Sequence, residues 1–290
     1  MIHTISNQFL TVSVESFGAE LRRIVAADGT RYLYEGDTPF WKASAPVLFP
    51  TVGKLFGGKY RYEGKEYELA GHGFARNNEF ELTQHTETSM TFTLCDTPET
   101  LQRYPFRFRF DVIFTLNGDT LEVRNRVANR TEGPMYFSLG AHEGYNCPLA
   151  EGESFTDYDI IFEQPETVVS QCIDVPTGLR TGESYPLLDN SAVLPLKYDY
   201  FETDAIVLTD LKSRAATLKS RVSGRGVEVR FPDFPMLGIW QKPGASYICI
   251  EPWCGVCDFI GFDGDLTQKA GIMCLETGET YENIHTIRPF

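Results

Sequence analysis

Hydrophobic and polar residues alternate with a period of two along much of the chain, which is the pattern of a strand with one buried face. Residues 108–116 and 121–127 show the alternation most clearly, and Asn117-Gly118-Asp119 lies between them. Because Asn-Gly readily adopts the positive φ angles of a tight turn, these residues predict a β-hairpin. Similar patterns around Asp28-Gly29 and Glu63-Gly64 predict two further hairpins.

Strand-like alternation returns in the last third of the chain, in residues 215–231 and 245–252. Helical periodicity is scarce by comparison. Many strands, little helix and turns rich in glycine and proline are typical of an all-β protein, and we expect a large antiparallel β-sandwich with few short helices. No Gly/Ser linker, low-complexity tract or repeat divides the sequence, so residues 1–290 are expected to form a single domain.

The best helix candidate is residues 96–106. Asp96 is expected to cap this helix and Pro98 to occupy its first turn. Glu99 would then close a capping box.

Charge and composition limit the classes of partner that this chain is expected to bind. The formal net charge is -14 at pH 7, which disfavours nucleic acid because binding to phosphate backbones requires clustered Lys and Arg. No run of about 18 apolar residues is present, and the N-terminus lacks the pattern of a signal peptide. We therefore expect no membrane contact and a cytoplasmic location. The seven cysteines, an odd number, indicate reduced thiols rather than a disulfide framework.

Cys254 and Cys257 form a CxxC pattern that resembles a redox dithiol. Such a motif requires a helix after the first cysteine, since the helix N-terminus lowers the pKa of the thiol. The residues that follow contain several glycines and no apolar stripe, and no second CxxC is available for zinc. We interpret the two cysteines as buried thiols without redox or metal chemistry.

Glu251 interrupts an apolar strand-like run and is followed by Pro252, which favours extended backbone at the glutamate. A carboxylate in apolar surroundings has a raised pKa and can act as a base near neutral pH. A solvent-facing glutamate at a strand end is the alternative.

Two of the five histidines lie among glycines and small polar residues, where a side chain is accessible. His72 is followed four residues later by Arg76, and His142 follows a strand-like stretch. Together with Glu251 they indicate an acid–base site, because histidine exchanges protons near pH 7. Asp204, directly before an apolar run, is a further candidate, with an ordinary turn aspartate as its alternative.

Aromatic residues lie within or near these segments: Phe74, Tyr145, Phe201, Trp240 and Trp253. Aromatic faces beside carboxylates, histidine and arginine are typical of a sugar site, although aromatics in a β-sandwich are more often core.

Five stretches carry a resemblance to a known family: residues 46–80, 138–149, 203–208, 234–258 and 277–290. They look like the aldose 1-epimerase (galactose mutarotase-like) superfamily, and most closely its LacX-like branch. The resemblance extends over nearly the whole chain and rests above all on the motifs HGFAR, GAH and IEPW.

This resemblance implies a large β-sandwich that interconverts the α and β anomers of a free aldohexose such as glucose or galactose. By the same resemblance, Glu251 matches the general base that takes the proton of the anomeric hydroxyl, and His142 matches the general acid that protonates the ring oxygen. His72 matches a histidine that contacts the sugar near that oxygen. No metal or organic cofactor is implied.

The resemblance also assigns sugar hydroxyl contacts to Arg76 and Asp204. Two positions depart from the branch. Lys54 stands where arginine is expected. Its ammonium group is a compact charge and cannot form the bidentate contacts of a planar guanidinium. Glu143 stands where proline is expected, and a carboxylate beside His142 would favour its imidazolium form. A cleft on one sheet face is expected to hold the sugar, lined by Trp240 and Phe74.

Other functions stay open on the sequence. A related group on the same fold acts on hexose 6-phosphates, for which Arg76 and Lys54 would hold the phosphate. The chain could instead be a carbohydrate-binding or regulatory protein that no longer catalyses the reaction, or a glycoside hydrolase or lyase using Glu251 and Asp204 as paired carboxylates. Long edge strands make a homodimer possible.

Overall fold

A computed structural model describes residues 1–36 and 40–290 of the chain. The strands within these residues are β1 Ile2–Ser6, β2 Leu10–Glu15, β3 Glu20–Ala26, β4 Lys59–Tyr62, β5 Lys65–Glu68, β6 Glu81–His85, β7 Ser89–Cys95, β8 Phe108–Asn117, β9 Thr120–Asn129, β10 Met135–Phe137, β11 Leu139–Gly140, β12 Glu143–Asn146, β13 Tyr158–Asp174, β14 Leu179–Pro195, β15 Ile206–Leu208, β16 Ala215–Ser220, β17 Gly226–Arg230, β18 Met236–Trp240, β19 Tyr247–Cys254, β20 Met273–Leu275 and β21 Thr280–Pro289. The helical segments are α1 Pro98–Arg103 and the 3-10 turns η1 Phe56–Gly58, η2 Ala75–Asn77, η3 Phe155–Asp157, η4 Tyr198–Phe201 and η5 Leu266–Gln268.

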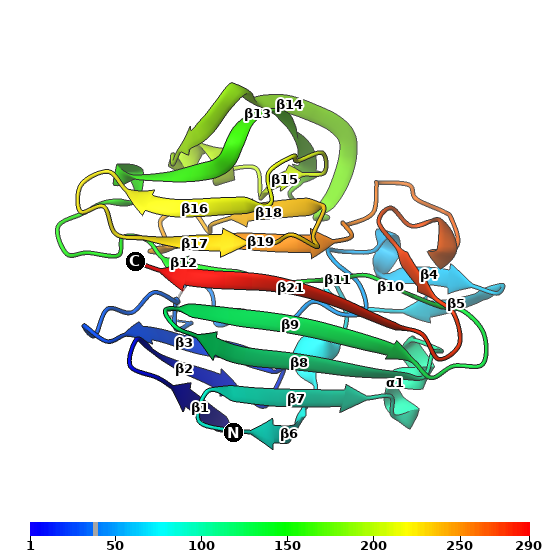
Figure 1. Cartoon of the computed structure of the whole chain (residues 1–290). Helices are drawn as coiled ribbons and strands as arrows, with labels where there is room; N and C mark the ends of the chain where they lie inside the picture. The colour runs from blue at the N-terminus through cyan, green and yellow to red at the C-terminus, as the bar shows by residue number, and fades with distance from the viewer. Residues whose placement is uncertain (37–39) are drawn as a thin grey trace.

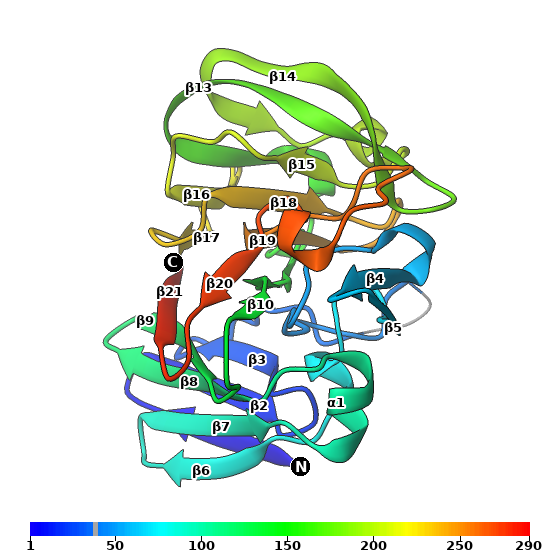
Figure 2. The same cartoon turned by 90° about the vertical axis from the view of Figure 1, so that its right-hand side faces the viewer.

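The architecture is an antiparallel β-sandwich, as predicted. One layer is a nine-stranded sheet in the order β14-β13-β16-β17-β21-β9-β8-β7-β6. Behind it lie the sheet β1-β2-β3 and the sheet β11-β19-β18-β15, in which β12 also pairs with β19 (Figure 1). Figure 2 shows the same layers edge-on, with the long hairpin β13–β14 arching over one end of the sandwich.

A large cluster of buried side chains fills the space between the layers and includes residues from β1 through β21. The alternation read from the sequence supplies it: Phe108, Phe110 and Phe114 of β8 are all at most 2% exposed. Period-two alternation thus sends one face of each strand into the core, which is the main source of favourable free energy in a sandwich of this kind.

Two of the three predicted hairpins form in full. Strand β8 pairs with β9 through Gly118, whose φ is 62°, and β4 pairs with β5 through Glu63 and Gly64, which also have positive φ. The hairpin expected at Asp28-Gly29 is reduced to a turn followed by one isolated bridge between Val25 and Arg31. Strands β16 and β17 also pair as expected.

The helix α1 forms where it was predicted, but its N-cap residue was predicted wrongly. Thr97, not Asp96, is the N-cap of α1, and Thr100 rather than Glu99 completes the capping box. Pro98 does occupy the first turn. Asp96 instead accepts a hydrogen bond from the backbone of Phe108 at 3.1 Å, which ties the helix entry to β8. No helix in residues 1–36 or 40–290 has the length and apolar character needed to cross a membrane.

Candidate active site

Strand β19 is the element on which the site is built. All eight of its residues are buried, and it lies between β18 on one side and β11 with β12 on the other. Because successive side chains of a strand point to opposite faces, Ile248 and Ile250 enter the main core. The alternate residues, including Cys249, Glu251 and Trp253, face away from that core.

A cavity of about 300 Å³ lies over this second face of β19, at the small end of the range for ligand sites, about 300–1,000 Å³. Seven of the residues predicted from the sequence line it: Lys54, His72, Arg76, His142, Asp204, Trp240 and Glu251. Segments far apart in the chain therefore meet at one cavity. Its wall also includes Trp41 and Trp253.

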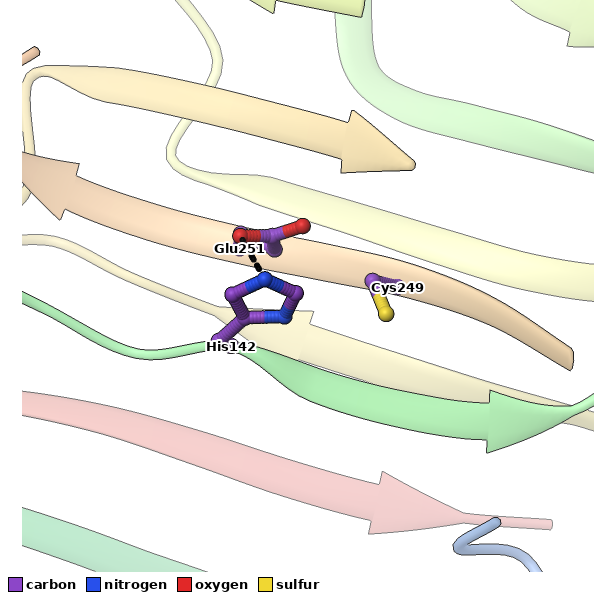
Figure 3. A group of neighbouring side chains, drawn as sticks. All are labelled: His142, Cys249 and Glu251. Atoms are coloured by element: carbon purple, nitrogen blue, oxygen red, sulfur yellow. Dashed lines mark ion pairs between the residues drawn. The ribbon is translucent and has the colours of Figure 1, made fainter. Parts of the chain in front are cut away.

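His142 and Glu251 meet because of strand register. Gly140 pairs with Trp253 and Glu143 pairs with Ile250, so the link between β11 and β12 carries His142 opposite Glu251. Their side chains lie 3.3 Å apart, from Nε2 to Oε2, as the dashed line in Figure 3 marks. The glutamate side chain is 2% exposed and the histidine side chain 12%, so this pair is largely shielded from water.

Burial changes the protonation of both groups. It raises the pKa of Glu251 well above its usual value, and the carboxylates of Glu143 and Asp204 act in the same direction. Burial also lowers the pKa of His142 to about 3, and the nearby Arg76 adds to this effect. Each side chain therefore favours its neutral form, and the pair together holds one proton near neutral pH.

His72 lies beside this pair, with its ring centroid 5.6 Å from that of His142. Its backbone has a φ of 66°, and at Gly73, which follows, a Cβ would lie 2.2 Å from the carbonyl oxygen of Phe49. The glycine is therefore required for this loop to pack. Gly53 N–H donates to His72 Nδ1 at 3.3 Å, which leaves Nε2 as the protonated nitrogen of the neutral ring. Burial lowers the pKa of His72 well below its usual value, so a neutral donor results.

Charged side chains surround the cavity. Arg76 is half-buried and donates to the carbonyl of Gly71 at 3.0 Å. Asp204 accepts from the backbone of Ala205 at 2.7 Å, and burial raises its pKa. Both side chains are held by the backbone and line the cavity.

Lys54 is exposed, and its stem lies between two glycines. A Cβ at Gly71 would come within 2.9 Å of Lys54 Cγ, and a Cβ at Gly178 within 2.9 Å of Nζ. Within the described residues the Lys54 ammonium forms no ion pair. A cation without a fixed partner is thus available at the edge of the cavity.

Two of the sequence expectations are corrected here. Phe74 does not line the cavity; it is 4% exposed and its ring packs in the core near Phe49 and Phe108. Glu143 does not reach His142, because adjacent residues project to opposite sides where β12 begins. Its carboxylate lies 3.0 Å from Nε2 of His285, on β21.

The CxxC cysteines have no redox geometry. Cys254 Sγ faces the core, where it contacts the carbonyl of Asp233, whereas Cys257 lies under Gly53 at the cavity wall. Burial raises the pKa of Cys254 to about 11 and also raises that of Cys257. Each of the seven cysteines, all within the described residues, is free. The interpretation as buried thiols agrees with this arrangement.

The sequence reasoning missed Trp41, which lies in a loop without periodic pattern. Its ring stacks on His142 at 5.1 Å between centroids, and the ring of Trp240 meets the same histidine edge-on at 5.9 Å. Cys249 was also missed as a neighbour of the pair. Ligand atoms of His142, Cys249 and Glu251 all lie within 4.8 Å of one another, so these three residues are the donor set that a metal ion would find here (Figure 3).

The antiparallel sandwich is the galactose mutarotase-like fold, which solved structures at 30–32% sequence identity share. The chain belongs to the aldose 1-epimerase family, a family of isomerases, whose sequence profile matches residues 1–287.

Individual relatives agree with this assignment. The chain is 38% identical over 260 residues to the plasmid-encoded protein LacX of Lactococcus lactis subsp. lactis, covering 87% of each protein. Among solved structures it is similar to a galactose mutarotase related enzyme of Lactobacillus acidophilus, with a TM-score of 0.94 and 32% identity over 100% of this chain and 97% of that one. A galactose mutarotase-like protein of Lactobacillus casei gives a TM-score of 0.94 at 30% identity and full coverage of both chains.

Proposed function

We propose that this protein is a mutarotase that interconverts the α and β anomers of a free aldohexose such as glucose or galactose. The observation that carries the proposal is the His142–Glu251 pair, 3.3 Å apart at the wall of a small cavity. Ring opening requires one group to remove the proton of the anomeric hydroxyl and a second group to protonate the ring oxygen. When the single proton that the pair shares lies on His142, its imidazolium and the Glu251 carboxylate supply both.

In the proposed mechanism Glu251 takes the proton from the anomeric hydroxyl, and His142 donates its Nε2 proton to the ring oxygen. The bond from C1 to the ring oxygen breaks and an open-chain aldehyde forms. Rotation about C1–C2 presents the other carbonyl face, and the reverse transfers close the ring as the opposite anomer. The proton count of the two side chains is the same before and after each half-reaction, so no external acid or base is consumed.

The remaining cavity residues position the sugar in this proposal. His72, with Nε2–H free to donate, contacts the sugar near the ring oxygen. Arg76 and Asp204 bind hydroxyl groups, since one donates and the other accepts. Trp41 and Trp240 supply the aromatic surface against which a pyranose ring packs.

A hexose 6-phosphate is the second candidate substrate. The specific observation in its favour is Lys54, whose ammonium has no ion-pair partner among the described side chains and lies at the same cavity as Arg76. Two cations at one cavity match the charge of a phosphate group.

The test is polarimetry of freshly dissolved α-D-glucose, α-D-galactose and α-D-glucose 6-phosphate. Wild type is compared with Glu251→Gln and with Glu202→Gln, which removes the same charge at an exposed position. Faster decay of rotation with wild type and Glu202→Gln, but not with Glu251→Gln, is expected for a free hexose. Acceleration only with the phosphate selects the second candidate. No acceleration with any sugar would leave a binding protein on this fold and overturn the proposal.

A further inference from the structure

The face of β19 that lines the cavity carries one group that the proposed reaction does not use. Cys249 lies two residues before Glu251, on the same face of the strand, and is completely buried. Trp41 and Trp240 pack against the cluster to which it belongs. Its strand partner is Gly144, where even a Cβ atom would lie 3.5 Å from the Cys249 sulfur. Figure 3 shows Cys249 on β19 beside the His142–Glu251 pair.

His142, Cys249 and Glu251 together offer imidazole nitrogen, sulfur and carboxylate oxygen, the three ligand types that zinc takes in proteins. All three ligand atoms lie within 4.8 Å of one another. Tetrahedral zinc holds its ligand atoms about 3.3–3.7 Å apart, given bonds of about 2.0–2.3 Å. The His142–Glu251 separation of 3.3 Å already fits, so the sulfur has to approach by roughly 1 Å.

Glu251 Oε2 is buried and, apart from its ion pair with His142 Nε2 at 3.3 Å, forms no hydrogen bond within the described part of the chain. A carboxylate oxygen has lone pairs for more than one partner, so coordination of a cation would satisfy it further. His142 and Glu251 also line the cavity, which leaves the fourth coordination position open to water or a sugar hydroxyl.

Charges of both signs face the cluster. The carboxylates of Glu143 and Asp204 act on Glu251, and that of Glu143 also acts on Cys249. Arg76 acts on His142, and Lys54 acts on Asp204 and His72. Two carboxylates and two cations are close to balance, so the negative charge for a divalent ion comes from the ligands themselves, the Glu251 carboxylate and the Cys249 thiolate, which lose their protons when the ion binds.

We propose that His142, Cys249 and Glu251 form a binding site for a thiophilic divalent cation such as Zn²⁺, and that the bound ion reversibly inhibits the enzyme. Coordination occupies the lone pair of His142 and the carboxylate of Glu251, which are the groups that exchange protons with the sugar. The inhibitory consequence rests on the proposed mutarotase function, whereas binding of the ion does not.

Binding is measured first, by equilibrium dialysis with Zn²⁺ and by the thiolate-to-cobalt absorption that Co²⁺ gives when it binds sulfur. The full chain is used with its three less buried thiols replaced, to remove competing ligands: Cys95→Ser, Cys172→Ser and Cys274→Ser. Cys249→Ser is compared in this background with Cys147→Ser, which alters another buried free thiol away from the cavity.

One ion per chain is expected in the background and in Cys147→Ser, with cobalt–thiolate absorption in both. Cys249→Ser should lose that absorption and bind Zn²⁺ at least about tenfold more weakly, since even the residues that support zinc ligands contribute 10- to 100-fold to affinity. No binding in the background, or equal binding by Cys249→Ser, would overturn the site. Thermal unfolding of each variant establishes that its fold is intact.

Activity is measured separately. Zn²⁺ should abolish mutarotation in the background, a chelator should restore it, and Cys249→Ser should require at least about tenfold more Zn²⁺ for half-inhibition of its own rate. Inhibition that is equally strong in Cys249→Ser would refute the assignment of the inhibitory ion to this cluster. If no sugar is turned over without metal, the mutarotase proposal fails, while cysteine-dependent binding would still establish the site.

Discussion

Replacement of Glu251 by glutamine keeps the shape of the side chain and removes its ability to take a proton. The carboxylate lies 3.3 Å from His142 and its side chain is 2% exposed, so no water replaces it readily as a base. General acid–base catalysis of this kind contributes typically 10²- to 10⁴-fold. We therefore expect kcat to fall by about that factor, which corresponds to roughly 2.7–5.4 kcal/mol of activation free energy.

The same variant should change stability with the opposite sign. Folding raises the pKa of Glu251 above its usual 4.5, mainly through burial. The stabilising effect of the bound proton is fully present below about pH 4.5 and is lost as the pH rises through the folded-state pKa. Glutamine carries no such proton. Relative to wild type, Glu251→Gln should therefore gain stability as the pH rises, by up to about 1.4 kcal/mol per pH unit within that window.

Urea unfolding of both proteins at several pH values between 5 and 8 measures the difference, with Glu202→Gln as the control for loss of one exposed charge. Polarimetry on the same samples gives the rate. Near-native turnover by Glu251→Gln would refute the assignment of the base. A stability difference that is the same at every pH would refute the raised pKa and, with it, the view that burial sets the protonation of the pair.

Three further changes test separate parts of the site. His142→Asn should lower kcat by about 10²- to 10⁴-fold, because it removes the proposed acid while keeping a polar side chain, and an unchanged rate in polarimetry would contradict this role. Trp41→Ala should raise KM by about 2- to 10-fold, since an aromatic contact contributes about 0.5–1.5 kcal/mol, and a sugar titration would show any failure of this expectation. The double variant Cys254→Ser/Cys257→Ser should keep near-wild-type kcat. Loss of its activity would indicate that one of these thiols takes part in the reaction.

The fold was predictable because its determinants are local. Period-two alternation and Asn-Gly or Glu-Gly turns act within about ten residues, and the β8–β9 and β4–β5 hairpins formed where they were expected. The error at α1 has the same local origin. Asp96 and Thr97 are both acceptable caps by residue type, and the hydrogen bond from Phe108, twelve residues away, engages Asp96 instead.

The site was less predictable, because side-chain direction depends on pairing between distant segments. The sequence alone could not reveal that the link between β11 and β12 lies opposite Glu251, since that register joins residues more than a hundred positions apart. The resemblance identified His142 and Glu251, but it did not indicate which way the side chain of Glu143 points. The partner of Glu143 is His285, which lies 142 residues further along the chain. Phe74 was misplaced for the same reason, as its loop turns the ring into the core.

The protonation of the buried pair has a consequence for the proposed reaction. A cyclic sugar requires the carboxylate of Glu251 and the imidazolium of His142, whereas the open aldehyde is accompanied by the carboxylic acid and the neutral imidazole. Burial raises the pKa of Glu251 and lowers the pKa of His142, so it favours the carboxylic acid together with the neutral imidazole. In the proposed reaction, the dry site therefore lowers the free energy of ring opening relative to water. Hydroxyl groups of the bound cyclic sugar must in turn stabilise the ion pair, which is why turnover should depend on residues such as Asp204 that hold those hydroxyls in place.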